Sequence, residues 1–464
     1  MLSAPDPVEI DRDLVVRFDA PGPRYTSYPT ADRFVEAFDA AAHGAWLARR
    51  SIGGISRPLS VYVHVPFCAS ICYYCACNKV ITRDHGRAAK YLRYLEKELD
   101  LQLAQLSGSR RISQLHWGGG TPTFLSHAEL RQLMAMLRAR FDFAADGEYA
   151  IEVDPRTVDA DTMGLLAELG FNRMSLGIQD IDPAVQKAIN RIQPVELTRA
   201  TLAAARAAGF DSVNFDLIHG LPRQSVESFS ATLDEVIREA PERIALYSYA
   251  HLPERFKPQR RIADHDMPSA ETKLSLFLLA VRRLLQAGYV YIGLDHFAKP
   301  DDELAVALRT GRLHRNFQGY STQPECDLLA LGVSSISKIG PVYSQNVRTL
   351  DEYYDCLDQG HLPVNRGIEL NSDDLARHAV IMGLMCQGRV AFESIEIAYL
   401  IDFHDYFASE LAEMSAFERA GLVEISRGDI TVTPRGRFFL RGICMLFDRY
   451  LQADRLRGRY SRII

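Results

Sequence analysis

Short blocks of hydrophobic residues alternate with longer amphipathic stretches from Val61 to Tyr249. The short blocks are rich in β-branched and aromatic residues, which is typical of buried strands, whereas the longer stretches repeat apolar positions at helical spacing. Strands are therefore expected at 61–65, 112–117, 149–153, 173–177, 212–217 and 244–249. Helices are expected between them at 87–106, 127–140, 159–169, 195–208 and 225–239.

This succession of strands and helices predicts an α/β fold with a parallel sheet, most naturally a partial (β/α)6 barrel. An open doubly wound sheet is the alternative. A barrel places functional groups just past the carboxyl ends of its strands. Polar and glycine-rich segments do follow the expected strands: a cysteine-rich loop after the first, and then Gly118–Pro122, Glu152 with Asp154, Gln179 with Asp180, Asp216 with Gly220–Pro222, and Tyr249–His251.

The rest of the chain shows other patterns. Residues 1–57 are expected to form an N-terminal extended arm, because prolines surround Arg24–Thr30 and argue against a helix. The arm either packs on the protein or closes over a site. The barrel domain is assigned to 58–305 and includes a helix at 271–287 and a strand at 289–293, and a connecting segment follows at 306–370. Residues 371–464 predict a mainly helical domain with a winged-helix-like hairpin that turns at Arg427–Gly428.

Composition narrows the possible partners. The 464 residues are 47% hydrophobic and 24% charged with a net charge of −6, as expected for a globular protein of two or three domains. This acidic balance argues against nucleic acid or an anionic membrane as a partner. The N-terminal residues lack the apolar core of a signal peptide, and no apolar run approaches the ~18 residues of a membrane span. We therefore expect a cytoplasmic protein, and the lack of an exposed heptad pattern favours a monomer.

Four of the eight cysteines lie between Cys68 and Cys77, which favours a reduced metal site over disulfides. Cys68, Cys72 and Cys75 form a Cys-x3-Cys-x2-Cys array, in which one tight loop can direct three thiolates to one cofactor. Three thiolates on a four-iron cluster leave one iron open to bind a small molecule. Zinc is the alternative, because four thiolates within ten residues could close a tetrahedral site. The scattered cysteines are expected to be small core residues, at Cys326, Cys356, Cys386 and Cys444.

The cysteine array, with Tyr74 before its last cysteine, resembles the signature of the radical S-adenosylmethionine (SAM) enzymes. Further motifs narrow the resemblance to the oxygen-independent coproporphyrinogen III oxidases. These motifs are HVPFCxxxCxYCxCNK, WGGGTPT (117–123), EVDPR (152–156), SLGIQD (175–180), NFDLIHGLP (214–222), YAHLP (249–253), DHFAKPDDELA (295–305) and HRNFQGY (314–320).

The resemblance implies that Cys68, Cys72 and Cys75 hold a [4Fe-4S] cluster and that SAM chelates the open iron. Cys77 is then not a ligand. The family positions that bind the cofactor correspond to Tyr62, Gly119, Gly120, Thr121, Glu152, Gln179, Arg191, Asp216 and Ala250. A second SAM molecule is implied beside the first, at Phe317, Gln318 and Ile336.

The implied reaction converts two propionates of coproporphyrinogen III to vinyl groups without oxygen, giving protoporphyrinogen IX in haem biosynthesis. It requires an external electron donor and an electron acceptor. Because the substrate carries four carboxylates, cationic side chains should line its site, and the candidates are Arg24, Arg255, Arg260 and Arg261. Two alternatives remain: a haem-binding chaperone relative, which lacks the arm and the His314–Tyr320 motif, and a non-enzymatic metal-binding scaffold.

Overall fold

The computed structural model describes residues 12–18, 22–51, 57–323 and 326–454. The chain forms two units. The barrel unit consists of Phe34–Ser269 and Glu325–Glu369, and the helical unit consists of Met1–Arg33, Ala270–Pro324 and Leu370–Ile464. The first residues of the expected arm, 1–11, lie outside the described residues. The predicted four-part division at 57, 305 and 370 stays a prediction.

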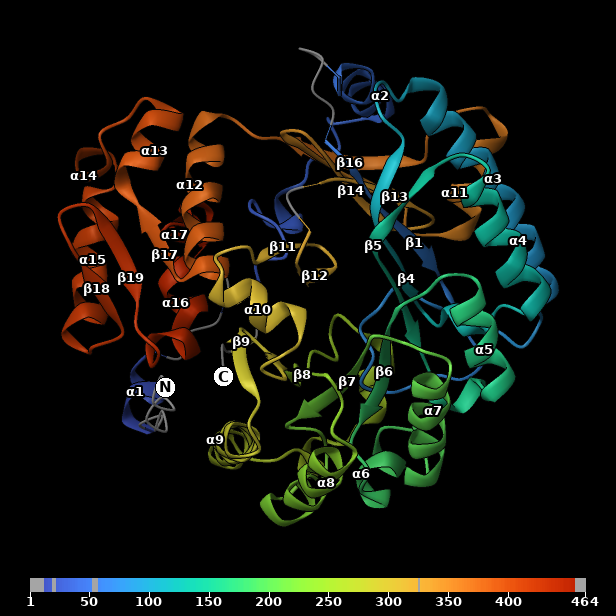
Figure 1. Ribbon diagram of the computed structural model, residues 1–464, viewed down its shortest axis with the longest axis horizontal. Helices are drawn as coiled ribbons and strands as arrows, with labels where there is room; N and C mark the ends of the chain where they lie inside the picture. The colour runs from blue at the N-terminus through green and yellow to red at the C-terminus, as the bar shows by residue number, and fades with distance from the viewer. Residues whose placement is uncertain (1–11, 19–21, 52–56, 324–325, 455–464) are drawn as a thin grey trace. The chain divides into compact units, whose positions relative to one another are not determined.

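Parallel strands form the centre of the barrel unit (Figure 1). Neighbouring strands follow the order of the sequence: β1 (Leu59–Val65), β4 (Arg111–Gly119), β5 (Asp142–Val153), β6 (Arg173–Gln179), β7 (Ser212–His219) and β8 (Arg243–Ser248). Each of these pairings is parallel. A doubly wound sheet would reverse its strand order at a switch point. The sequential order confirms the partial barrel and all of the predicted strands.

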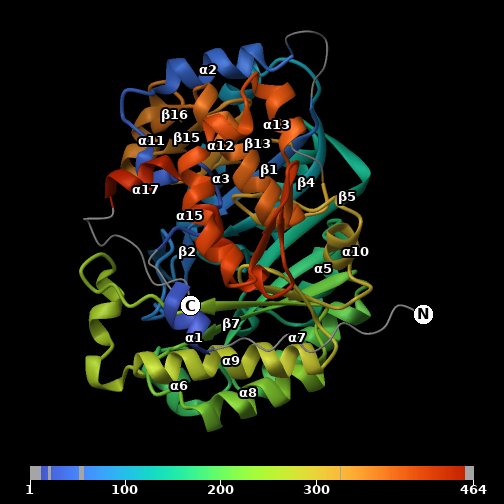
Figure 2. The ribbon, with the colours of Figure 1, turned by 90° about the vertical axis from the view of Figure 1, so that its left-hand side faces the viewer.

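The predicted helices lie on the outer face of these strands (Figure 1 and Figure 2). They are α3 (Gly86–Gln105), α4 (His127–Arg138), α5 (Ala160–Glu168), α7 (Val195–Ala207) and α8 (Val226–Glu239), with a short α6 (Pro183–Ala188) after β6. Side-chain caps fix where several begin. Ser126 and Glu129 form a capping box at α4, and Asp159 accepts from the Thr162 N–H at α5.

The sheet continues beyond β1 with four strands from residues 306–370, which are predicted to be a connecting segment. β13 (Asp327–Leu331) pairs in parallel with β1, and β14 (Ile336–Ile339), β15 (Val342–Asn346) and β16 (Val364–Glu369) follow in antiparallel order. The buried Glu98 of α3 accepts hydrogen bonds from the Gly332 N–H (2.7 Å), Asn346 (2.6 Å) and Tyr353 (2.6 Å). These bonds join α3 and α11 (Leu350–Asp358) to the added strands.

The N-terminal segment is extended only in part. Residues 22–30 are not helical, as the prolines predict, but α1 (Arg12–Phe18) and α2 (Ala40–Arg49) are helices. Asp39 caps α2 by accepting from the Ala42 N–H at 2.9 Å. Tyr25 and Tyr28 are buried, and the Tyr25 hydroxyl donates to Asp448 at 2.9 Å. The described arm therefore packs within the helical unit.

The helical unit also contains the predicted C-terminal hairpin. β18 (Val423–Ile425) and β19 (Asp429–Val432) pair antiparallel, and β17 (Arg389–Ala391) adds a third strand. Short elements lie between residues 295 and 321: β10 (His296–Ala298), α10 (Glu303–Arg309), β11 (His314–Asn316) and β12 (Gly319–Ser321). The remaining elements are α9 (Ala270–Gln286), β9 (Val290–Gly293), α12 (Ser372–Met382), α13 (Phe392–Tyr399), α14 (Phe403–Tyr406), α15 (Ala408–Arg419), α16 (Leu440–Met445) and α17 (Arg449–Asp454). The winged-helix comparison stays a prediction. Among the described helices, none has both the length and the apolar character needed to cross a membrane.

Candidate active site

The cysteine loop begins where β1 ends. Short strands β2 (Phe67–Cys68) and β3 (Val80–Ile81) pair at the base of the loop, and the Thr82 N–H donates to the Cys68 carbonyl at 3.0 Å. All eight cysteines of the chain are free thiols. Cys72 is buried, Cys68 and Cys75 are half-buried, and Cys77 is exposed. The three predicted ligands therefore lie on one loop whose two ends are joined by the pairing of β2 and β3.

Hydrogen bonds from the barrel hold the backbone of the cysteine loop. Asn190 donates to the Ile71 carbonyl at 2.7 Å, and the Tyr73 N–H donates to the Ile189 carbonyl at 2.9 Å. The buried amide of Gln259 donates to the carbonyls of Tyr74 (3.0 Å) and Ala250 (3.2 Å). The loop is therefore fixed at both ends and in its middle.

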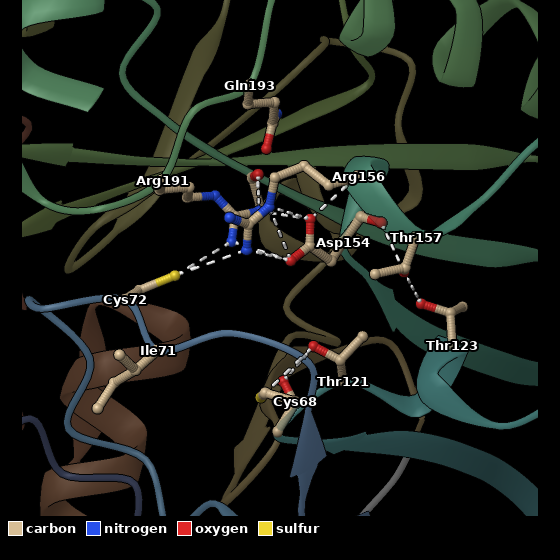
Figure 3. A network of polar contacts seen from close by, with 12 residues as sticks. Cys68, Ile71, Cys72, Thr121, Thr123, Asp154, Arg156, Thr157, Arg191 and Gln193 are labelled. Atoms are coloured by element: carbon tan, nitrogen blue, oxygen red, sulfur yellow. Dashed lines mark hydrogen bonds and ion pairs between the residues drawn. The ribbon is translucent and has the colours of Figure 1, made fainter. Parts of the chain in front are cut away.

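Two arginines converge on the Cys72 thiol (Figure 3). Arg156 donates to Cys72 Sγ at 3.6 Å, and Arg191 donates to it at 3.8 Å. Asp154 lies between them, 2.6 Å from Arg156 and 3.2 Å from Arg191. Burial alone would raise the pKa of Asp154, but the two guanidinium groups hold it below its ordinary value. Two cations thus face one carboxylate and one sulfur.

The glycine-rich turn after β4 packs closely against its surroundings. A Cβ at Gly120 would lie 2.6 Å from the Pro66 carbonyl oxygen, so this position requires glycine, and a Cβ at Gly118 would lie 2.7 Å from Glu152 Oε1, so the Glu152 carboxylate would have to move. The Gly119 N–H donates to Glu152 at 3.2 Å, and the Gly120 N–H donates to Val65 at 2.8 Å. Both N–H groups therefore form hydrogen bonds within the protein. Thr121 Oγ1 lies 3.7 Å from Cys68 Sγ, which joins the turn to the cysteine loop.

Glu152 near the end of β5 and Asp216 in β7, two strands separated by β6, have pKa values shifted in opposite directions. Burial tends to raise the pKa of Glu152, yet hydrogen bonds from His116 (3.2 Å) and Gly119 lower it below its ordinary value. Burial raises the pKa of Asp216 to about 7, although Ser175 (2.8 Å) and Asn214 (2.9 Å) donate to its carboxylate. At neutral pH, Glu152 is ionised and Asp216 is near its titration midpoint.

The structure brings most of the predicted cofactor residues to the ends of the barrel strands. Tyr62 on β1 stacks on His116, with ring centroids 5.8 Å apart, and Gln179 ends β6 with a φ of 67°. Phe317 and Gln318 belong to the helical unit, whereas Ile336 lies on β14 of the barrel unit, so the second SAM site stays a prediction.

Two of the predicted substrate arginines have partners on the barrel unit. Arg261 lies over the Tyr73 ring, 5.3 Å from its centroid, and Arg260 donates to the Pro253 carbonyl at 3.0 Å. His116, Arg156 and Gln259 also contribute to the site, and the sequence analysis predicts a role for none of them. Of these, only Arg156 could have been proposed from the sequence, because it is the last residue of the EVDPR motif (152–156).

The donor set fits a four-iron cluster. Each of three cysteines in such a cluster binds a different iron, so their sulfurs need not meet at one point. Within the described part of the chain, no three His, Cys, Asp or Glu side chains are arranged to hold a single metal ion. The two arginines beside Cys72 match the negative charge of a thiolate-bound cluster. The charge around Cys72 therefore suits a thiolate-bound cluster.

Comparisons with known proteins support the same interpretation. The Radical SAM superfamily matches residues 62–236, and the HemN C-terminal domain matches residues 370–439. The chain is 52% identical to the oxygen-independent coproporphyrinogen III oxidase of Pseudomonas aeruginosa, covering 99% of this chain and 100% of that protein. It is 47% identical to the Escherichia coli protein of the same name, covering 98% and 99%.

A solved structure agrees over almost the whole chain. It is coproporphyrinogen III oxidase (HemN) from Escherichia coli, described as a radical SAM enzyme, with a TM-score of 0.90 at 47% identity, covering 96% of this chain and 100% of that one. These similarities favour the oxidase over the chaperone relative. The chain therefore belongs to the oxygen-independent coproporphyrinogen III oxidases, a family of radical SAM enzymes.

Proposed function

We propose that the protein converts coproporphyrinogen III to protoporphyrinogen IX by oxidative decarboxylation of two propionates to vinyl groups, without oxygen, in haem biosynthesis. The observation that carries this proposal is the cysteine loop, whose Cys72 thiol faces Arg156 and Arg191 at the carboxyl ends of the barrel strands. Similarity over 99% of the chain to an oxidase of this name supports the choice of substrate.

Cys68, Cys72 and Cys75 would hold the [4Fe-4S] cluster. When bound, the cluster and SAM would supply one-electron radical chemistry at a substrate propionate. Arg156 and Arg191 offset the negative charge beside Cys72, and Asp154 fixes both guanidinium groups. An external donor would supply the electrons that this chemistry consumes, and an external acceptor would take up those that remain after CO2 leaves.

The strand ends would bind and orient SAM. The ionised Glu152 can accept a hydrogen bond from an amine or a hydroxyl of the cofactor, and Gly119 at the end of β4 and Gly120 after it would lie beside the cofactor. Tyr62, Thr121, Gln179, Asp216 and Ala250 complete the proposed site of the first molecule. Phe317, Gln318 and Ile336 would contact a second molecule. Equilibrium dialysis with labelled SAM tests this stoichiometry: two molecules per chain are expected, falling to one in Gln318→Ala.

Anaerobic turnover tests the function. With reductant and SAM, the protein should convert coproporphyrinogen III to a product whose mass is lower by two CO2 and four hydrogen atoms, because each propionic acid group loses CO2 and two hydrogens as it becomes a vinyl group. Cys72→Ser serves as the inactive control. An intact cluster that cleaves SAM without any CO2 release would instead favour the haem-binding chaperone.

We further propose that the enzyme is a cytoplasmic monomer without nucleic acid or membrane partners. The net charge of −6 supports this, because neither polyanion would be attracted to the whole molecule. Light scattering of purified protein should give the mass of one chain, 52.1 kDa. A mass of twice this value would contradict the monomer.

A further inference from the structure

Three arginines surround one carboxylate in the helical unit. Arg24 Nη1 lies 3.6 Å from Asp295 Oδ2, and Arg441 Nη2 lies 3.7 Å from Asp295 Oδ1. Arg315 donates to the carbonyls of Tyr25 (3.4 Å) and Arg24 (3.5 Å) and is close enough to stabilise the ionised Asp295. We call Arg24, Arg315 and Arg441 the arginine cluster. Asp295 alone among these four residues is anionic.

Two members of the arginine cluster, Arg315 and Arg441, have buried nitrogen atoms whose hydrogen-bonding capacity is not met. The ion pair of Arg441 with Asp295, at 3.7 Å, is too long for a good hydrogen bond. Arg441 is only 3% exposed, and neither its Nε nor Arg315 Nη1 has a hydrogen-bond partner among the described residues. Burial lowers the pKa of Arg441; Asp295 opposes this, but Arg24 and Arg315 add to the lowering. One carboxylate is shared among three cations here, so the buried charge is not fully balanced.

The position is accessible and suited to a carboxylate. The Arg24 side chain is 35% exposed, so a ligand can reach the cluster from solvent. The planar fork of arginine matches a carboxylate bidentately. We propose that the arginine cluster binds a propionate carboxylate of the porphyrinogen substrate. This inference rests on the proposed function and adds the residues that recognise the substrate.

Chemistry indicates which propionate is bound. A reacting propionate loses its negative charge as CO2 leaves, so three cations around it would stabilise the reactant more than the transition state. A propionate that persists in the product suffers no such penalty. The arginine cluster therefore holds one of the two propionates that are retained, and the product should keep this contact.

Porphyrin binding tests the assignment without requiring turnover. The probes are coproporphyrin III, which has four carboxylates, deuteroporphyrin IX, which has only the two retained propionates, and coproporphyrin III tetramethyl ester, which has none. Arg24→Gln and Arg441→Lys should each weaken binding of the first two probes about tenfold, equivalent to about 1.4 kcal/mol. They should not change the already weak binding of the ester.

Controls separate binding from folding. Arg12→Gln changes an exposed arginine of the same unit that pairs with Glu271, and it should bind all three probes like the unmodified protein. Iron content and SAM affinity report whether each variant has folded. Inorganic phosphate that displaces coproporphyrin III at millimolar concentration would show a general anion site and overturn the assignment.

The outcomes distinguish this inference from the proposed function. Unchanged porphyrin affinity in both folded variants would overturn the arginine cluster while leaving the enzyme activity intact. Arginine-dependent porphyrin binding without CO2 release would reject the proposed function but retain the carboxylate site. Weakened binding of coproporphyrin III but not of deuteroporphyrin IX would reject the retained propionate as the ligand.

Discussion

Two groups of arginines in the helical unit differ in how their positive charge is balanced. Arg377 pairs with Asp373 at 2.8 Å and with Glu410 at 2.7 Å, and Arg449 pairs with Asp373 and Asp374. In the arginine cluster, Arg24 and Arg441 share the carboxylate of Asp295 at 3.6 and 3.7 Å. The first group is balanced by carboxylates of the protein, whereas in the second a buried nitrogen of Arg315 and one of Arg441 have no hydrogen-bond partner among the described residues. The ratio of carboxylates to arginines therefore distinguishes the structural network around Arg377 from the binding site that we propose at the arginine cluster.

The barrel unit supports the same distinction. Arg156 and Arg191 share Asp154, and the remaining positive charge faces the sulfur of Cys72. Here the missing anion would be the thiolate-bound cluster. An excess of buried cations thus marks a ligand in both units, although the ligands differ in chemistry.

Removing the sulfur beside the barrel arginines should have the largest effect. Cys72→Ser should lose the cluster and lower activity by at least about 10³-fold, because the hard hydroxyl is a poor iron ligand in place of a thiolate. Cys77→Ser is the matched control and should keep its iron, since Cys77 is exposed and is not a proposed ligand. Iron and sulfide analysis of the two purified variants measures how much cluster each retains. Equal iron loss in the two variants would make Cys77 part of the site.

Removing a cation from the balanced group should reduce stability and leave substrate binding intact. Arg377→Gln leaves Glu410, which is 4% exposed, without its 2.7 Å partner, and breaking a buried pair costs about 3–5 kcal/mol. Urea unfolding measures this loss. Arg24→Gln should cost less than about 1 kcal/mol, because it reduces an excess of positive charge. A larger loss in Arg24→Gln than in Arg377→Gln would break the comparison between the groups.

The carboxylate of Asp216 accepts hydrogen bonds from Ser175 and Asn214, whereas that of Asp154 is bound by two arginines. Because its pKa in the folded state rises to about 7 from the ordinary 3.8, folding favours the protonated form. The free energy of unfolding should therefore fall as pH rises from about 4 to 7, by up to about 1.4 kcal/mol per pH unit. Above pH 7 this contribution is constant.

Asp216→Asn tests this pH dependence, because the amide does not titrate. Urea unfolding at pH 5, 6, 7 and 8 should show that the stability of the variant relative to the unmodified protein increases up to pH 7. Asp154→Asn provides the contrast, since the arginines lower the pKa of Asp154 and its stabilisation is lost only as pH falls below about 4. A difference independent of pH would contradict the raised pKa of Asp216.

The smallest expected effect is that of substituting Arg156, which should change the reduction potential of the cluster. Arg156→Gln removes a cationic donor to Cys72 Sγ, so the cluster should become harder to reduce. One charge-assisted hydrogen bond of about 1.4 kcal/mol corresponds to roughly 60 mV for one electron. A redox titration followed by electron paramagnetic resonance measures the shift, with Arg131→Gln as an exposed control whose partner, Glu168, lies on α5. A potential equal to that of the control would remove Arg156 from the cluster environment.

Local patterns predicted the barrel strands, their helices and the cysteine loop, because each depends on residues close together in the sequence. Long-range contacts were not accessible in this way. β13 joins β1 from about 270 residues away, and the strands after it are too short to carry a strong alternating pattern. Arg24 was predicted as a substrate arginine, but Arg315 and Arg441 come from distant segments that only the fold brings to Asp295.

The hydrogen bonds from Asn190 and Gln259 to the cysteine loop have a consequence for cluster assembly. They hold the backbone of Ile71 and Tyr74 through contacts that involve no metal, so we expect the loop to keep its shape without iron. A cluster destroyed by oxygen could then be rebuilt in a folded protein. Repair would require a supply of iron and sulfide, and the polypeptide need not be made again.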